Sequence, residues 1–164
     1  MKGLVVYHTK YGNGKIIAEA IAKGLEEAGH DITVGEVDKE GMGADFDFVV
    51  LSSPTRAGRM TGAVKRFIGR DLKKDSWKGK PFVAVGTGFK AKRDGTKFDG
   101  YGARSAEKVY EALEKAGLKP ATEPQKFFVE DMKGPLLDGE EERALDFGRS
   151  IGQELGSGPK SSIS

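Results

Sequence analysis

The chain has 164 residues, of which 37% are hydrophobic and 32% are charged, a balance that suits one domain with its own core. It contains no cysteine, which excludes disulfides, thiolate metal sites, iron–sulfur ligation and cysteine catalysis. It contains only two histidines, which are too few for most zinc sites. The formal net charge of +2 is too small to make nucleic acid the expected partner. No apolar run reaches the roughly 18 residues that span a bilayer, and no signal-peptide pattern precedes the first apolar run. We therefore expect a cytoplasmic protein without a membrane span.

Strand-like and helix-like patterns alternate from one end of the chain to the other. In chain order they predict a strand at 4–8, a helix at 15–28, strands at 31–37 and 46–52, a helix at 61–72, a strand at 81–86, a helix at 103–116, a strand at 126–129 and a helix at 140–155. Unbroken apolar runs are typical of strands that are covered on both faces. Gly29 is a natural stop for the first helix, and Thr61 can cap the second.

Helices between consecutive strands require parallel pairing with right-handed crossovers, so we expect an α/β fold, a three-layer sandwich around a five-stranded parallel sheet. One domain would cover 1–155, and the tail 156–164, which contains Gly, Ser, Pro and Lys, would be disordered. In a sheet with the strand order 2-1-3-4-5, ligands bind beyond the carboxyl ends of strands 1 and 3, where the order reverses. The loops after His8, Ser52 and Gly86 therefore form the expected site.

The loop after the first strand, here called the anion loop (9–15), carries the residue types of an anion site. It consists of Thr9, Lys10, Tyr11, Gly12, Asn13, Gly14 and Lys15. Its glycines let the backbone curl so that amide groups point inward, and the following helix adds a positive partial charge at its N-terminus. A phosphate monoester suits such a loop, although a plain tight turn between a strand and a helix can have the same residues.

Other nucleotide motifs do not fit the anion loop. The Walker A motif requires a glycine where Thr9 stands and a hydroxyl where Ile16 stands. The dinucleotide motif, read from Gly12, requires a small residue where Ile17 stands.

The loops after the third and fourth strands can form the walls of a slot for a flat ring. The first of these, here called the first ring loop (53–61), begins with Ser53, Pro54, Thr55, Arg56, Ala57 and Gly58. The second begins with Thr87, Gly88 and Phe89, and it continues through Lys90, Lys92, Arg93 and Lys97 to Phe98 and Tyr101. Thr55 offers a hydroxyl, and Phe89, Phe98 or Tyr101 can stack on the face of a heterocycle. Core packing is the other ordinary role of each aromatic.

These three loops together resemble those of the flavodoxin-like FMN-binding family, over roughly residues 3–155. Thr9-Lys10-Tyr11-Gly12-Asn13 is similar to the family's phosphate loop, Ser53-Pro54-Thr55 opens a first ring loop, and Thr87-Gly88-Phe89 lies where the second begins. The resemblance implies a sheet in the order 2-1-3-4-5, bound FMN and redox chemistry. The residues expected to bind the cofactor are Thr9, Lys10, Tyr11, Gly12, Asn13, Gly14, Lys15, Pro54, Thr55, Arg56, Ala57, Gly58, Thr87, Gly88, Phe89 and Phe98.

The sequence departs from the family pattern at three points. Gly14 stands where the family's phosphate loop usually has Thr or Ser, and Arg56 stands where the first ring loop often has an aromatic. The net charge is +2, whereas electron-carrier flavodoxins are typically acidic. Positive charges at Arg56, Arg59 and Lys90 would stabilise a reduced, anionic flavin and so raise its potential.

The sequence contains no pattern of a catalytic triad, a metal cluster or paired catalytic carboxylates, so a bound flavin would carry the electrons. Our leading interpretation is an electron-transfer flavoprotein whose basic rim docks an acidic redox protein such as a ferredoxin. A second is an FMN-dependent oxidoreductase acting on a quinone or a porphyrinogen, because the motifs also resemble the flavodoxin-related protoporphyrinogen dehydrogenase branch. A third is a flavin-free interaction module on the same fold, which Gly14 favours.

Overall fold

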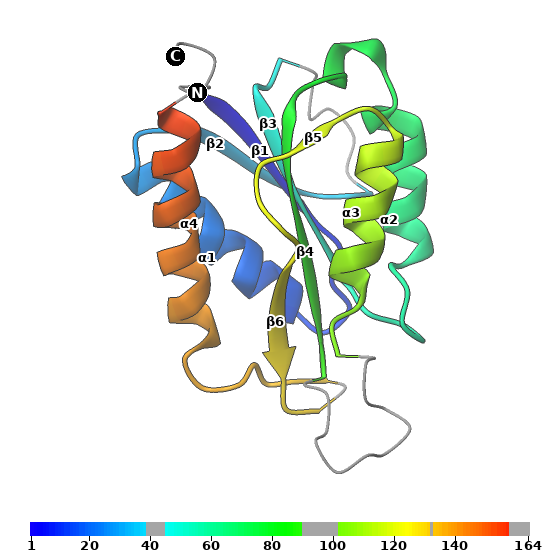
Figure 1. Cartoon of the computed structure of the whole chain (residues 1–164). Helices are drawn as coiled ribbons and strands as arrows, with labels where there is room; N and C mark the ends of the chain where they lie inside the picture. The colour runs from blue at the N-terminus through cyan, green and yellow to red at the C-terminus, as the bar shows by residue number, and fades with distance from the viewer. Residues whose placement is uncertain (39–44, 90–101, 132, 158–164) are drawn as a thin grey trace.

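The computed structural model describes residues 1–38, 45–89, 102–131 and 133–157, and six strands within these ranges form one parallel sheet (Figure 1). The strands are β1 (Lys2–Tyr7), β2 (Asp31–Glu36), β3 (Phe48–Pro54), β4 (Pro81–Phe89), β5 (Lys119–Pro120) and β6 (Gln125–Val129). Their order is β2-β1-β3-β4-β5, with β6 also paired to β4. The predicted order 2-1-3-4-5 is therefore confirmed.

Two short strands share the fifth position of the sheet, whereas the sequence predicts one strand at 126–129. β5 pairs with residues 81–82 of β4, and β6 pairs with residues 85–89. Pro120 and Pro124 flank the interruption, and neither has the N–H group that a continuous ladder needs. The second piece, β6, lies beside the carboxyl end of β4, where the candidate site is found.

Helices cover both faces of the sheet, which confirms the predicted three-layer sandwich (Figure 1). In the described ranges, α1 (Asn13–Glu27) and α4 (Glu140–Gly156) cover one face, and α2 (Gly62–Phe67) and α3 (Ser105–Lys115) cover the other. None of these helices has both the length and the hydropathy needed to cross a membrane.

The predicted helix at 61–72 is not one regular α-helix. Thr61 caps α2 as expected, since its hydroxyl accepts a hydrogen bond from the Val64 N–H. After α2 the chain widens into a π-helical turn, η1 (Ile68–Leu72), and a 3₁₀ turn, η2 (Asp75–Trp77), follows.

The strands divide their side chains between two cores because successive residues point to opposite faces. In β3, Val49 and Leu51 pack toward α2 and α3, whereas Phe48 and Val50 pack toward α1 and α4. Both cores are closed to solvent, which explains the unbroken apolar run of this strand.

Helices α1 and α4 approach each other closely because glycines lie where they cross. A Cβ atom at Gly148 would lie 2.3 Å from the carbonyl oxygen of Ile21, and one at Gly24 would lie 2.4 Å from that of Leu145. Real side chains do not tolerate such distances, so both positions require glycine. The contact fixes the axis of α1, whose N-terminus lies at the candidate site.

We expect Gly148→Ala to lower the free energy of unfolding by about 2 kcal/mol or more, because the added methyl group separates the two helices. Gly156→Ala in the same helix is the matched control, since its Cβ would meet the His30 ring at an ordinary 3.7 Å. Urea unfolding of both variants gives the comparison. Equal midpoints would show that the close crossing does not fix α1.

Candidate functional site

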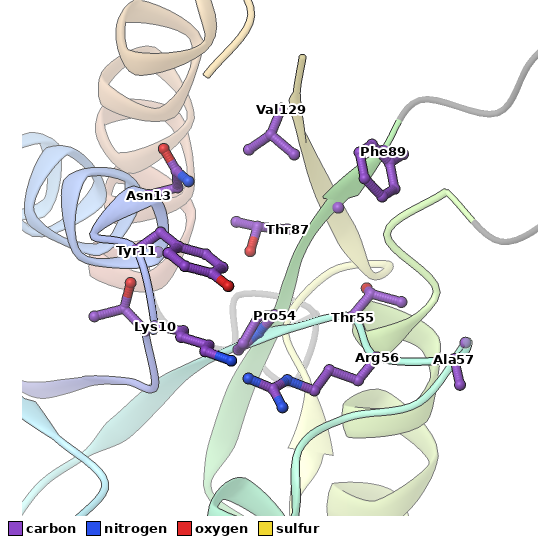
Figure 2. A pocket seen from close by; sticks show the side chains of 14 residues that line it. Lys10, Tyr11, Asn13, Pro54, Thr55, Arg56, Ala57, Thr87, Phe89 and Val129 are labelled. Atoms are coloured by element: carbon purple, nitrogen blue, oxygen red, sulfur yellow. The ribbon is translucent and has the colours of Figure 1, made fainter. Parts of the chain in front are cut away.

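A pocket of about 630 Å³ opens at the carboxyl ends of β1, β3 and β4 (Figure 2). It lies where the strand order reverses, as the sequence predicts for this topology. Its lining consists of Thr9, Lys10, Tyr11, Asn13, Gly14, Pro54, Thr55, Arg56, Ala57, Gly58, Thr87, Gly88, Phe89 and Val129. The three predicted loops therefore meet around one cavity.

Three of the predicted cofactor-binding residues are not in this lining. Gly12 and Lys15 belong to the anion loop but do not line the pocket. Phe98 lies outside the described residues, as do Lys90, Lys92, Arg93, Lys97 and Tyr101. The prediction missed Val129, which pairs with Phe89 at the end of β6. The sequence contained a signal for Val129, because this residue ends the strand predicted at 126–129, which follows the strand at 81–86 in the expected sheet order.

The start of α1 presents unpaired backbone donors to the pocket. Asn13, Gly14 and Lys15 are the first three residues of the helix, so their N–H groups have no acceptor within it, and no side chain caps this end. The turn into the helix depends on Gly12, whose φ is +92°. Its N–H donates to the Thr9 hydroxyl (2.9 Å), which leaves the hydroxyl proton for another acceptor. This arrangement suits a phosphate group.

The side chain of Asn13, which lines the pocket, also holds the anion loop in place. Its Nδ2 donates to the carbonyl oxygen of Lys133 at 3.3 Å. The neighbouring Gly134 allows this approach, because a Cβ there would lie 2.6 Å from Asn13 Oδ1. The anion loop is thus tied to the loop that follows β6.

Two exposed aromatic side chains form walls of the pocket. Tyr11 is 40% exposed and Phe89 is 46% exposed. Both line the pocket, and Figure 2 shows the Tyr11 ring extending from the anion loop and Phe89 at the end of β4. Exposed aromatics at a pocket suit the faces of a flat heterocycle. The sequence predicts Phe89 as a wall, but it predicts Tyr11 only as part of the anion loop.

The first ring loop ends in a tight turn at the pocket. Arg56 and Arg59 exchange two backbone hydrogen bonds of 2.9 Å each, and the residues between them, Ala57 and Gly58, have φ values of +51° and +75°. Two central residues with positive φ define a type I′ turn. This turn brings the predicted Ala57–Gly58 peptide to the edge of the pocket.

The Thr55 hydroxyl, which the sequence offers to the site, forms its hydrogen bonds with Ser105 in this structure. It donates its proton to Ser105 Oγ at 2.8 Å and accepts from the Ser105 N–H at 3.1 Å. Thr55 still lines the pocket, where its methyl group and backbone remain available.

His8, which follows β1, is hydrogen-bonded to the last residue of the first ring loop. Its Nδ1 lies 2.7 Å from the hydroxyl oxygen of Thr61, which also accepts from the Val64 N–H. The imidazole and the Thr61 hydroxyl are therefore joined by a hydrogen bond at Nδ1. This histidine is a structural partner of the loop and not a member of the pocket lining.

Burial lowers the pKa of His8 below its ordinary value, because it removes the charged imidazolium from water. The carboxylates of Asp38 and Glu36 act in the opposite direction, and the guanidinium groups of Arg56 and Arg66 add to the lowering. His8 is therefore neutral at pH 7.

Positively charged side chains that have no ion-pair partner in the described part of the chain lie at the pocket, two of them, Lys10 and Arg56, in its lining. Lys10, Arg56 and Arg59, here called the basic rim, are exposed and form no ion pair within the described ranges. Among the described residues, no Asp or Glu lines the pocket, and these residues hold no group of three potential metal ligands. By contrast, Arg143 and Arg149 are paired with Glu140 and Glu27. The pocket therefore favours an anionic ligand.

The fold and the site together define a flavodoxin-like redox protein. A family model described as a flavodoxin domain matches residues 4–129, and the chain belongs to this flavodoxin domain family. Membership confirms the family predicted from the loops and, with it, FMN as the cofactor. The pocket fits FMN in two respects, the unpaired N–H groups of α1 for its phosphate and the walls of Tyr11 and Phe89 for its ring system.

Solved structures share the fold over nearly the whole chain. A flavodoxin from the domain Archaea gives a TM-score of 0.75 at 20% identity and covers 95% of this chain and 99% of its own. Oxidised flavodoxin 1 from Bacillus cereus gives 0.73 at 18% identity, over 92% and 97% of the two chains. These likenesses confirm the predicted flavodoxin-like architecture.

Curated relatives match a shorter region. An NAD(P)H dehydrogenase (quinone) from Paracoccus denitrificans (strain Pd 1222) is 29% identical over 87 residues, which are 40% of this chain and 42% of that protein. A second, from Caulobacter vibrioides (strain NA1000 / CB15N), is 30% identical over 89 residues, 40% of this chain and 44% of its own length. The chain thus matches less than half the length of these relatives.

We expect the lowered pKa of His8 to make the protein less stable at mildly acidic pH. The unfolded chain binds a proton at His8 near pH 6.5, but the folded chain binds it only at lower pH. The free energy of unfolding therefore falls as the pH drops from about 7.5 through this window. His8→Asn keeps a hydrogen-bonding group for Thr61 and cannot titrate, so urea unfolding from pH 8 to pH 5 should show a shallower slope in this variant. Identical slopes would exclude His8 as the source.

We expect Gly14→Ser to tighten FMN binding about 10-fold, because it adds a hydroxyl beside the unpaired N–H groups of α1, and a hydrogen bond to a charged group contributes about 1.5–3 kcal/mol. A Cβ at this position would lie 3.1 Å from the carbonyl oxygen of His8, which must shift slightly. Gly14→Ala is the control for this crowding. Titration of the apoprotein with FMN and with riboflavin, which lacks the phosphate, measures the effect.

The gain in affinity from Gly14→Ser should appear with FMN and not with riboflavin, which lacks the phosphate. A Gly14→Ser variant that binds FMN no more tightly than Gly14→Ala would contradict the assignment of the anion loop to the phosphate.

Proposed function

We propose that this chain is an electron-transfer flavoprotein that binds FMN in the pocket and exchanges electrons with an acidic redox protein, such as a ferredoxin. The observation that carries this proposal is the basic rim. Lys10 and Arg56 line a pocket with two exposed aromatic walls, and Arg59 closes the turn that begins at Arg56. No carboxylate lines that pocket in the part of the chain that the structure describes.

The residues of the pocket have distinct tasks in this proposal. FMN, when bound, supplies the electron-transfer chemistry, and the protein supplies binding, orientation and electrostatics. The N–H groups at the start of α1 hold the phosphate. Tyr11 and Phe89 shield the ring from water, and the Ala57–Gly58 peptide offers its N–H and C=O groups at the ring edge.

The basic rim gives the partner its charge preference. Exposed charges of one sign around a binding surface speed the encounter with an oppositely charged protein and orient it. Salt screens this attraction over roughly 8–10 Å. Because Lys10 and Arg56 line the pocket itself, a docked acidic protein would bring its own redox centre close to the bound flavin.

The first experiment is purification of the recombinant protein followed by an absorbance spectrum and identification of the released cofactor. Oxidised FMN gives bands at about 375 and about 450 nm. A preparation that stays colourless and does not take up added FMN would refute the proposal and favour the flavin-free interaction module.

The second experiment measures the docking surface. We expect the rate of electron transfer from the reduced protein to an acidic ferredoxin to fall with ionic strength, and Arg56→Gln/Arg59→Gln to lower it about 5-fold at low salt. Lys115→Gln/Lys119→Gln is the matched control, because Lys119 pairs with Pro81 at the opposite end of β4. Equal losses in both double variants would reject the basic rim as the docking surface.

We also expect Arg56→Gln/Arg59→Gln to lower the reduction potential of the bound flavin. The two positive charges favour the reduced, anionic flavin, and each 1 kcal/mol of that interaction corresponds to roughly 40 mV for one electron. Both side chains are exposed, so screening limits the shift to tens of millivolts. Potentiometric titration tests it, and an unchanged or higher potential would contradict the electrostatic role.

A second candidate is an FMN-dependent oxidoreductase acting on a quinone or a porphyrinogen. The observation that favours it is the match to quinone dehydrogenases over part of the chain. Steady-state assays with NAD(P)H and a quinone distinguish the two. An enzyme turns over rapidly in two-electron cycles with these substrates alone, whereas a carrier requires its protein partner.

A further inference from the structure

Ser105, the first residue of α3, is joined to the first ring loop by three hydrogen bonds. Its hydroxyl lies 2.7 Å from the carbonyl oxygen of Ser53 and 2.8 Å from the Thr55 hydroxyl, and its N–H donates to that hydroxyl at 3.1 Å. A carbonyl oxygen can only accept, so the Ser105 proton points to Ser53. The Thr55 proton must then point to Ser105, which gives every donor in this set one acceptor.

The hydrogen-bonded group of Ser53, Thr55 and Ser105 is closely packed, and the neighbouring strand β4 has no room there for a residue larger than glycine. Ser53 and Ser105 are both 0% exposed. A Cβ at Gly86 would lie 2.5 Å from Ser105 Oγ, and one at Gly88 would lie 3.2 Å from Thr55 Oγ1. Two glycines of β4 therefore make room for these hydroxyls. The predicted cofactor residue Gly88 has this packing role in addition to its place in the pocket lining.

Thr55 directly precedes the turn that faces the pocket. The turn contains Ala57 in the left-handed region, at φ +51°, a conformation that costs a non-glycine residue roughly 1 kcal/mol or more. Such a turn keeps its shape only when its surroundings hold it. The Thr55 N–H donates to the Thr87 carbonyl at 2.9 Å, and Ser105 holds the Thr55 side chain.

We propose that Ser105 is a positioning residue for the cofactor site. It does not line the pocket, and it acts through Thr55, which it orients so that the turn at 56–59 stands in place before the cofactor arrives. The proposal rests on the proposed function, because the turn has a ligand to meet only if FMN binds. Pre-ordering the turn avoids an entropy cost on binding, so loss of the Ser105 hydroxyl should weaken FMN binding.

The chain offers a matched control in Ser52. Ser52 is also buried, at 1% exposed, but its hydroxyl has no hydrogen-bond partner among the described residues. Ser105→Ala and Ser52→Ala thus remove the same atoms from similar surroundings. We expect Ser105→Ala to raise the Kd for FMN about 10-fold, and Ser52→Ala to change it less than about 2-fold.

Thr55→Val tests the hydrogen bonds between Thr55 and Ser105 by removing the Thr55 hydroxyl. It should match Ser105→Ala, and the double variant should be no weaker than either single one, because both remove one shared interaction. Thr55→Ser keeps the hydroxyl and should restore the affinity that Thr55→Val loses. If Ser105→Ala does not fold, the two Thr55 variants carry the test.

Nitrogen-15 relaxation of the Ala57 and Gly58 amides in the flavin-free protein supplies a readout that does not depend on FMN. Lower order parameters in Ser105→Ala than in Ser52→Ala would support the proposal. Unchanged order parameters with an unchanged Kd, even with a lower melting temperature, would overturn it and leave Ser105 a purely structural residue. A wild-type protein that binds no FMN would refute the proposed function and this role with it, whereas a Kd unaffected by Ser105→Ala refutes this role alone.

Discussion

The parallel pairing of β1, β3 and β4 is the constraint on which the whole site depends. Parallel strands end at the same edge of a sheet, so loops that are far apart in the sequence meet there. Tyr7 lies beside Ser52, and Pro54 lies beside Thr87, which brings the anion loop, the first ring loop and the end of β4 together. Helices cover both faces of the sheet and leave this edge open to the pocket.

The chemistry of the site is largely backbone chemistry. Helix α1 begins without a side-chain cap, and its first N–H groups therefore remain available to an anion. The close crossing of α1 and α4 at Gly24 and Gly148 holds these donors in place. Side chains add the two aromatic walls and the basic rim. A pocket with aromatic walls, backbone donors and no carboxylate among its described residues suits a flat anionic ligand, and FMN has this form.

Three elements share the task of holding the first ring loop. His8 at the end of β1 is hydrogen-bonded to Thr61, Ser105 at the start of α3 binds Thr55, and the Thr87 carbonyl accepts from the Thr55 N–H. The loop therefore takes its shape from the scaffold around it together with the two backbone hydrogen bonds of its own turn. This explains how Ala57 can occupy a left-handed conformation that it would avoid in a free chain.

The sequence by itself determined the layers and the three loops that carry the site, because apolar periodicity and glycine-rich turns are local properties of the chain. Most residues predicted to bind the cofactor line one pocket for this reason. The strand order was implied by the resemblance of these loops to the flavodoxin-like family. Only the tertiary structure decided that the fifth strand is split between Pro120 and Pro124 and that Thr55 gives its proton to Ser105. These features depend on atoms that meet across different elements, and no local pattern encodes such meetings.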